Sequence, residues 1–153
     1  MSDSKDAQTE KATIVTWIDS LSVGIEELDN QHKHLINLTN KLYRACKIGD
    51  NTLDAEFKET MNRMANYVRS HFAAEQKLFT EISYPKYMEH KKEHDNMVYK
   101  IIKTLKEYEG NKDFIPMDFV VFLKNWIVDH VASSDHEYGA YYRTWRIKNK
   151  KYN

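Results

Sequence analysis

Residues 53–81 read LDAEFKETMNRMANYVRSHFAAEQKLFTE, and this stretch decides the fold. Mostly apolar residues recur in it at steps of three and four, which is the spacing of one face of an α-helix. The resulting stripe comprises Phe57, Met61, Met64, Val68, His71, Glu75 and Leu78. The stretch therefore predicts one long amphipathic helix, which carries a histidine and a glutamate on the face that should be apolar.

The same period occurs three more times along the chain. It recurs over about residues 26–47, where Gly49 should terminate the helix, and over about residues 86–109, where Gly110 should terminate it. A fourth run starts near Pro116, a residue suited to the first turn of a helix. Because short loops join the four helices, neighbours must be antiparallel. We predict an all-α protein, an antiparallel up-down-up-down four-helix bundle.

The ends of the chain do not follow this period. Residues 1–12 lack apolar periodicity and predict a flexible tail, and residues 14–25 predict an N-terminal arm that packs across the bundle. The bundle with its arm should span residues 13–145, and residues 146–153 should form a basic, solvated C-terminal tail. A chain of 153 residues is the usual size of one domain.

Composition excludes several classes of function. Lys plus Arg and Asp plus Glu number 23 each, so no net field favours nucleic acid or an acidic membrane. No apolar run approaches the roughly 20 residues that span a bilayer, and the start of the chain lacks the pattern of a secretory signal. We therefore expect a cytoplasmic protein. The single Cys46 excludes an internal disulfide, and we expect it to be a small buried residue on a helix.

Polar residues interrupt the buried stripe of every predicted helix. Burying an unpaired polar side chain costs about 1 to 3 kcal/mol, so repeated cases need a common partner. The residues are His32, His71, Glu75, His90, His94, His130 and Asp135. Five imidazoles and two carboxylates are too many ligands for one octahedral ion, and suit two ions that the carboxylates bridge. His34 and His136 fall off the stripes, and we expect them at the surface.

Each position alone would support a simpler interpretation. A single histidine on an apolar face, such as His32, is more often a hydrogen-bonded core residue than a metal ligand. A helical pair such as His71 and Glu75 is common on solvated faces. The agreement of seven positions on four helices favours the metal.

The sequence resembles the bacterial hemerythrins over roughly residues 14–140. The resemblance is carried by the matching stretches Ser22-Val-Gly-Ile-Glu-Glu-Leu-Asp-Asn-Gln-His32, His71-Phe-Ala-Ala-Glu75, Tyr84-Pro85 leading to His90 and His94, and Trp126-Ile-Val-Asp-His130 through Asp135. It implies two non-haem iron ions, one held by three histidines (His90, His94 and His130) and the other by two (His32 and His71). Glu75 and Asp135 would bridge both ions, together with an oxo or hydroxo group.

The resemblance also implies a role for that iron pair. Dioxygen would bind reversibly at the iron that has two imidazoles, because this iron has an open position. Ile127 lies three residues before His130 on the same helical face, so we expect it over the dioxygen site, with Trp126 and Phe72 as lesser candidates. The family often has leucine at the place of Ile127, and branching at Cβ stiffens the side chain.

One spacing conflicts with a regular helix. Residues five apart lie about 140° round an ideal α-helix, so His130 and Asp135 cannot both face the bundle axis. We predict a distortion between Ala132 and Ser134, either a π-type turn or the end of the helix.

These observations leave three functions to compare. The first is a dioxygen carrier without catalytic turnover, for storage, transport or sensing, with a redox or oxygen-consuming protein as its partner. The second is a di-iron enzyme acting on dioxygen, peroxide or nitric oxide, but such enzymes in related bundles are richer in carboxylate ligands. The third is a structural bundle that only stores metal. The predicted outer faces of the helices are charged and include no large apolar patch, so we expect a monomer.

Overall fold

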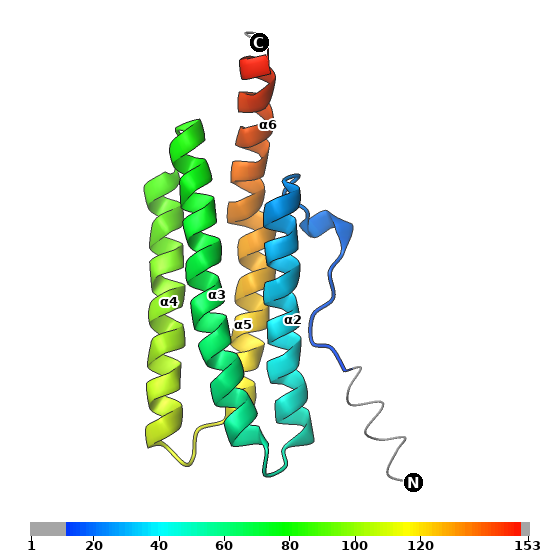
Figure 1. The fold of residues 1–153 in the computed structure, drawn as a ribbon, viewed down its shortest axis with the longest axis vertical. Helices are drawn as coiled ribbons and strands as arrows, with labels where there is room; N and C mark the ends of the chain where they lie inside the picture. The colour runs from blue at the N-terminus through cyan, green and yellow to red at the C-terminus, as the bar shows by residue number, and fades with distance from the viewer. Residues whose placement is uncertain (1–11, 151–153) are drawn as a thin grey trace.

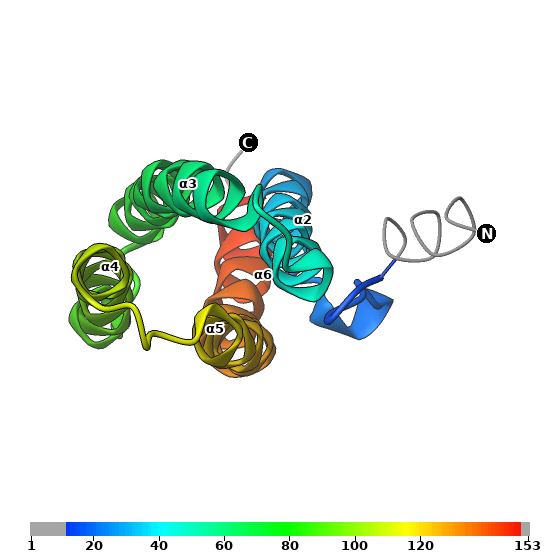
Figure 2. The same ribbon diagram turned by 90° about the horizontal axis from the view of Figure 1, so that it is seen from below.

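The computed structural model describes residues 12–150, which form a bundle of long helices. In chain order the elements are η1 (Asp19–Leu21), α2 (Glu26–Ile48), α3 (Leu53–Ile82), α4 (Tyr87–Gly110), α5 (Pro116–His130), η2 (Val131–Asp135) and α6 (His136–Lys150). The α5–η2–α6 segment runs on as one column (Figure 1). With α2, α3 and α4 it makes an up-down-up-down bundle around a common axis (Figure 2), which confirms the predicted fold.

Local backbone chemistry ends the helices close to the predicted positions. Gly49 follows α2 with φ 59°, a left-handed conformation that glycine adopts without steric cost, and its N–H donates to the carbonyl of Ala45. Pro116 occupies the start of α5, where its missing N–H leaves no helical hydrogen bond unmade. The connection from α2 to α3 and the connection from α4 to α5 lie at the same end of the bundle (Figure 1).

The N-terminal arm lies along the outside of α2 (Figure 2). The buried side chain of Asn40 fixes it, because its Oδ1 accepts hydrogen bonds from the backbone N–H groups of Ile14 and Val15, at 2.9 and 3.1 Å. Its Nδ2 donates to the carbonyl of Val15 at 2.8 Å. The arm then turns towards α2, and Val23 N–H donates to Asp29 Oδ1 at 2.8 Å. The side-chain amide of Asn40 thus satisfies three backbone groups of the extended arm.

The arm also closes against α6 at a glycine. Gly139 lies directly beneath Val23, and a Cβ atom added at Gly139 would stand 2.5 Å from the carbonyl oxygen of Val23. The guanidinium of Arg143 donates to the same carbonyl at 3.5 Å. The close approach of arm and helix therefore depends on the missing side chain.

The column formed by α5 and α6 is distorted where the sequence predicted. Residues Val131–Asp135 form one π-helical turn, and the N–H of His136 donates to the carbonyl of Val131, five residues earlier. The wider turn brings His130 and Asp135, both buried, to the same side of the helix. The prediction of a π-type turn is confirmed.

The expected basic C-terminal segment is helical where the structure describes it: residues 146–150 are exposed and continue α6, which projects beyond the other helices (Figure 1). One expectation needs correction. Cys46 is half-buried rather than buried, because it lies near the end of α2, and burial raises its pKa to about 11. The predicted tail at residues 1–12 falls almost wholly outside the described residues.

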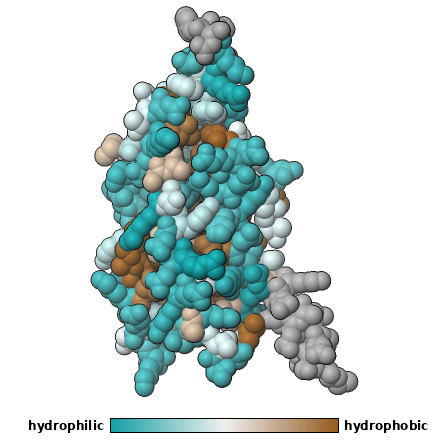
Figure 3. Space-filling model, viewed as in Figure 1, coloured by the Kyte–Doolittle hydropathy of each residue, from teal (hydrophilic) through white to brown (hydrophobic). Residues whose placement is uncertain are grey.

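The outer face of the bundle is polar where Figure 3 shows it, with small separate apolar areas. Among residues 12–150, no helix is both long enough and apolar enough to cross a membrane.

Candidate metal centre

The seven polar residues singled out in the sequence come together inside one half of the bundle. They are His32 from α2, His71 and Glu75 from α3, His90 and His94 from α4, and His130 and Asp135 from the α5–η2 column. None is more than 6% exposed, although the side chains are polar. This half is the end where α2 and α4 begin and α3 and α5 end, so each helix supplies its residues from the same level.

The seven side chains divide into two groups that share the carboxylates. His90, His94 and His130, here called the three-histidine group, lie with Glu75 and Asp135 within one cluster of candidate ligand atoms. His32 and His71, the two-histidine group, form a second cluster with the same two carboxylates.

Each carboxylate turns one oxygen to each group. Glu75 Oε1 lies 3.3 Å from His32 Nε2 and 3.1 Å from His71 Nε2, whereas Glu75 Oε2 lies 3.2 Å from His90 Nε2 and 3.0 Å from His94 Nε2. Asp135 divides likewise: Oδ1 lies 3.1 and 3.0 Å from Nε2 of His90 and His130, and Oδ2 lies 3.1 Å from His32 Nε2. This is the arrangement of two bridging carboxylates.

These distances fit the edges of a coordination polyhedron. A metal binds an imidazole nitrogen at about 2.1 Å, and two such ligands at right angles are then about 3 Å apart. The nitrogen–oxygen separations within each group are 3.0 to 3.3 Å. Each group therefore has the dimensions of ligands that converge on one ion.

Unsatisfied atoms point to the same conclusion. Nε2 of His94, Nε2 of His130 and both oxygens of Asp135 are buried and have no hydrogen-bond partner, although they lie about 3 Å from other polar atoms of the cluster. Buried polar atoms without partners are rare, and several of them grouped at one place fit the ligands of a metal ion. The donor set, imidazole with carboxylate, suits a first-row transition metal such as iron.

Outer contacts orient two of the imidazoles. His71 Nδ1 lies 2.7 Å from Oε1 of Gln31, and His130 Nδ1 lies 2.7 Å from Oε2 of Glu93. If Nε2 binds a metal, Nδ1 carries the proton and donates these hydrogen bonds. Glu93 also accepts hydrogen bonds from the hydroxyl of Ser134, at 2.8 and 3.0 Å, which ties α4 to the π-helical turn.

A tyrosine completes the surroundings of Glu75. The hydroxyl of Tyr138, which is fully buried, donates to Glu75 Oε1 at 2.7 Å. Burial and the neighbouring charges of Glu75 and Asp135 raise the pKa of Tyr138 well above its usual range, so the phenol keeps its proton. Tyr138 therefore acts as a fixed donor to one oxygen of the glutamate.

The metal-free cluster binds protons where a metal would bind. Burial alone lowers the pKa of His32 and of His130, but the neighbouring carboxylates outweigh it and raise these values to about 9 and about 10. Burial also disfavours the charged form of Glu75 and Asp135, yet the imidazoles hold both pKa values well below their usual range. Burial lowers the pKa of His94.

Metal binding should therefore release protons. At pH 7 the metal-free protein carries protons on His32 and His130, whose pKa values are about 9 and 10, and only neutral imidazole binds a metal. We expect proton release on addition of Zn²⁺ or Co²⁺, and an apparent affinity that rises with pH up to about pH 10, above which both imidazoles are neutral without a metal. A pH indicator in weakly buffered solution measures the release, with already loaded protein as the control. Binding without proton release would contradict this charge state.

Ile127, Trp126 and Phe72 were expected over the dioxygen site. Ile127 is 3% exposed and packs in the core of the bundle. The ring of Trp126 stacks on His130 at 4.3 Å between centroids, which places it against the three-histidine group rather than the two-histidine group. Phe72 stacks on His94 at 3.7 Å and also lies 5.6 Å from His71, so it borders both groups.

The sequence did not single out Gln31, Glu93, Ser134 or Tyr138. Each is a polar residue next to or near a position of a buried stripe. The one available signal was the three-residue step from Asp135 to Tyr138, which places both residues on one helical face. His34 and His136, expected at the surface, are half-buried, and neither belongs to the cluster. The ring of His34 instead lies 4.2 Å from that of Tyr67.

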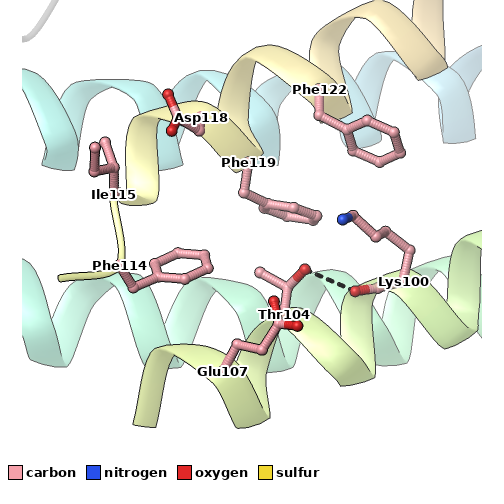
Figure 4. A pocket seen from close by; sticks show the side chains of 8 residues that line it. All are labelled: Lys100, Thr104, Glu107, Phe114, Ile115, Asp118, Phe119 and Phe122. Atoms are coloured by element: carbon pink, nitrogen blue, oxygen red, sulfur yellow. Dashed lines mark hydrogen bonds between the residues drawn. The ribbon is translucent and has the colours of Figure 1, made fainter. Parts of the chain in front are cut away.

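A separate pocket of about 220 Å³ opens between α4 and α5 near the loop that joins them (Figure 4). Its apolar wall includes Phe114, Phe119 and Phe122. Two of its polar groups have partners within the protein: Thr104 donates to the carbonyl of Lys100, and the ammonium of Lys100 lies 5.2 Å from the ring of Phe122. The pocket contains none of the seven clustered residues.

Comparison with known proteins gives consistent matches. The model of the hemerythrin HHE cation binding domain matches residues 23–142. Bacteriohemerythrin of Clostridium acetobutylicum is 30% identical over 125 residues, which cover 80% of this chain and 96% of the relative. Bacteriohemerythrin of Methylococcus capsulatus is 25% identical over 82% of this chain and 95% of its own. A crystal structure of wild-type hemerythrin matches with a TM-score of 0.76 at 25% identity, over 84% of this chain and 97% of that one.

Proposed function

Because the chain belongs to the hemerythrin family, we propose that its buried cluster holds two iron ions and binds dioxygen reversibly, without catalytic turnover. The observation that supports this most strongly is the division of two carboxylates between a three-histidine and a two-histidine group. A pair of ferrous ions, when bound, would supply the two electrons for reversible reduction of dioxygen. The remaining features of the site follow from the protein's own residues.

The unequal groups determine where a ligand can enter. His90, His94 and His130 would hold one ion together with both carboxylates and a bridging oxo or hydroxo group, which fills an octahedron. His32 and His71 would hold the other ion with the same bridges, which leaves one position for dioxygen. Ile127, which is buried, is the proposed apolar neighbour of that position.

Burial protects the site from water. Both carboxylates are fully buried, and the imidazoles are at most 6% exposed. Excluding water and protons limits the side reactions in which dioxygen would leave as superoxide or peroxide and the iron would stay oxidised. The ligand set has five imidazoles and only two carboxylates, and Tyr138 keeps its proton because its pKa is raised well above the usual range. These features favour binding and release over oxidation of a substrate.

An optical titration tests the proposal. Protein loaded with Fe²⁺ in the absence of oxygen should be almost colourless, develop a visible absorption band in air, and lose it again when oxygen is removed. The cycle should repeat with the same amplitude, and the iron content should be close to two per chain. A protein that stays colourless in air, or that consumes oxygen continuously in the presence of a reductant, would overturn the proposal.

We also propose that the protein works as a monomer in the cytoplasm and exchanges electrons or oxygen with another protein. The polar face in Figure 3 supports a monomer, because it lacks the large apolar area typical of a stable dimer interface.

A further inference from the structure

The outer contacts of the two histidine groups differ in charge. On the three-histidine side, His130 Nδ1 lies 2.7 Å from the carboxylate of Glu93. On the two-histidine side, His71 Nδ1 lies 2.7 Å from the neutral amide oxygen of Gln31. The two hydrogen bonds have the same length and use the same ring nitrogen, so they differ chiefly in the charge of the acceptor; Glu93 also accepts a hydrogen bond from Ser134 on the same oxygen, at 2.8 Å.

Charge at this position changes how strongly an imidazole donates electrons. A carboxylate draws the Nδ1 proton towards itself, which makes Nε2 more electron-rich and a better ligand for ferric iron. An amide oxygen accepts the same hydrogen bond without a full charge and has a smaller effect. His130 should therefore stabilise ferric iron more strongly than His71.

Tyr138 adds to the same asymmetry. Its hydroxyl donates to Glu75 Oε1 at 2.7 Å, and Oε1 is the oxygen that faces His32 and His71. Oε2, which faces the three-histidine group, does not receive this bond. A hydrogen bond to a carboxylate oxygen withdraws electron density from it, so Glu75 donates less to the two-histidine side.

We propose that Glu93, Gln31 and Tyr138 are positioning residues that set the reduction potentials of the two irons to different values, with the lower potential at the three-histidine iron. The inference rests on the proposed di-iron function. All three contacts favour the same difference: Glu93 makes the three-histidine iron electron-rich, Gln31 does so less for the two-histidine iron, and Tyr138 withdraws electron density from the two-histidine side. In the half-oxidised protein, the three-histidine iron should therefore be the ferric one.

The division matches what each ion has to do. The three-histidine iron would exchange no ligand, and an electron-rich environment would make it the better electron donor. Both irons would have to return to the ferrous state when dioxygen leaves, and the neutral outer contact would favour that return at the two-histidine iron, where the ligand departs. A carboxylate hydrogen-bonded to an imidazole on both sides would favour permanent oxidation of both irons.

Three substitutions that preserve shape test the inference by redox titration of the iron-loaded protein. Glu93→Gln should raise the midpoint potential, whereas Gln31→Glu and Tyr138→Phe should lower it. A tenfold change in the relative affinity for ferric and ferrous iron corresponds to about 59 mV for one electron, and we expect shifts of this order. Glu107→Gln is the matched control, because Glu107 is also on α4 and its side chain is 47% exposed, against 44% for Glu93.

Mössbauer spectra of half-oxidised protein assign the site. Wild-type protein should carry ferric iron at the three-histidine site, and the double variant Glu93→Gln with Gln31→Glu should carry it at the other. Equal midpoints for Glu93→Gln and Glu107→Gln, or ferric iron at the two-histidine site of the wild type, would overturn the inference. If Glu93→Gln loses iron, the other two variants decide. Wild-type protein with fewer than two irons would instead defeat the proposed function, whereas two irons of equal potential would defeat only this inference.

Discussion

Replacing Glu75 by alanine should abolish stable binding of both metal ions. Glu75 is the residue that contacts four of the five histidines: Oε1 reaches His32 and His71, and Oε2 reaches His90 and His94. Its removal therefore takes a ligand from each ion and the bridge between them. It also leaves buried imidazoles without their counter-charge, which costs about 3 to 5 kcal/mol when one partner of a buried ion pair is lost.

Metal analysis after dialysis measures the effect. Wild-type protein should retain close to two ions per chain and Glu75→Ala almost none, and metal should raise the unfolding temperature of the wild type only. Glu75→Gln keeps the shape and the hydrogen bond from Tyr138, so it serves if the alanine variant does not fold, and it should hold at most one ion. Glu107→Ala on α4 is the surface control. Two ions per chain in Glu75→Gln would refute the bridging role.

Gly139→Ala should destabilise the protein more than a surface substitution can. The added Cβ would lie 2.5 Å from the carbonyl oxygen of Val23 and 3.3 Å from its carbonyl carbon, and a backbone cannot move aside as a flexible side chain can. Val23 is 1% exposed and held by its hydrogen bond to Asp29, so the arm would have to leave α6. Overpacking of this kind costs about 1 to 3 kcal/mol.

Thermal unfolding followed by circular dichroism tests this expectation. For a protein of this size, we expect a fall of roughly 3 to 10 °C in the unfolding temperature. Gly110→Ala is the control, because a Cβ there meets nothing within 4 Å and alanine favours the helical state. If the two alanine variants unfold at the same temperature, the close contact between arm and α6 does not stabilise the fold.

The sequence allowed the fold and the cluster to be predicted because both depend on periodicity. Apolar stripes placed the first three helices to within a residue or two and gave the start of the fourth, and Gly49 and Pro116 marked ends whose backbone chemistry is local. The π-helical turn was predictable for a related reason: His130 and Asp135 are five residues apart, and a regular helix cannot point both inward.

The outer contacts could not be predicted in the same way. Glu93 and Gln31 are half-buried, and from the sequence they look like the many charged and polar residues that face solvent. Their partners lie 37 and 40 residues away on other helices, so the contacts depend on how the helices rotate against one another. For the same reason, helical phase gave the face on which Trp126 lies, but not that its ring would stack on His130.

The π-helical turn has a consequence for how the chain can vary. Ala132 and Ser133 are exposed, so their side chains touch neither the core nor the cluster, and many residue types would serve there. The number of residues between His130 and Asp135 has no such freedom, because one more or one fewer would change the winding of the turn and with it the orientation of Asp135, Tyr138 and Gly139. The length of this segment is therefore constrained more strictly than its sequence: Val131 is buried and Ser134 donates to Glu93, but Ala132 and Ser133 can vary.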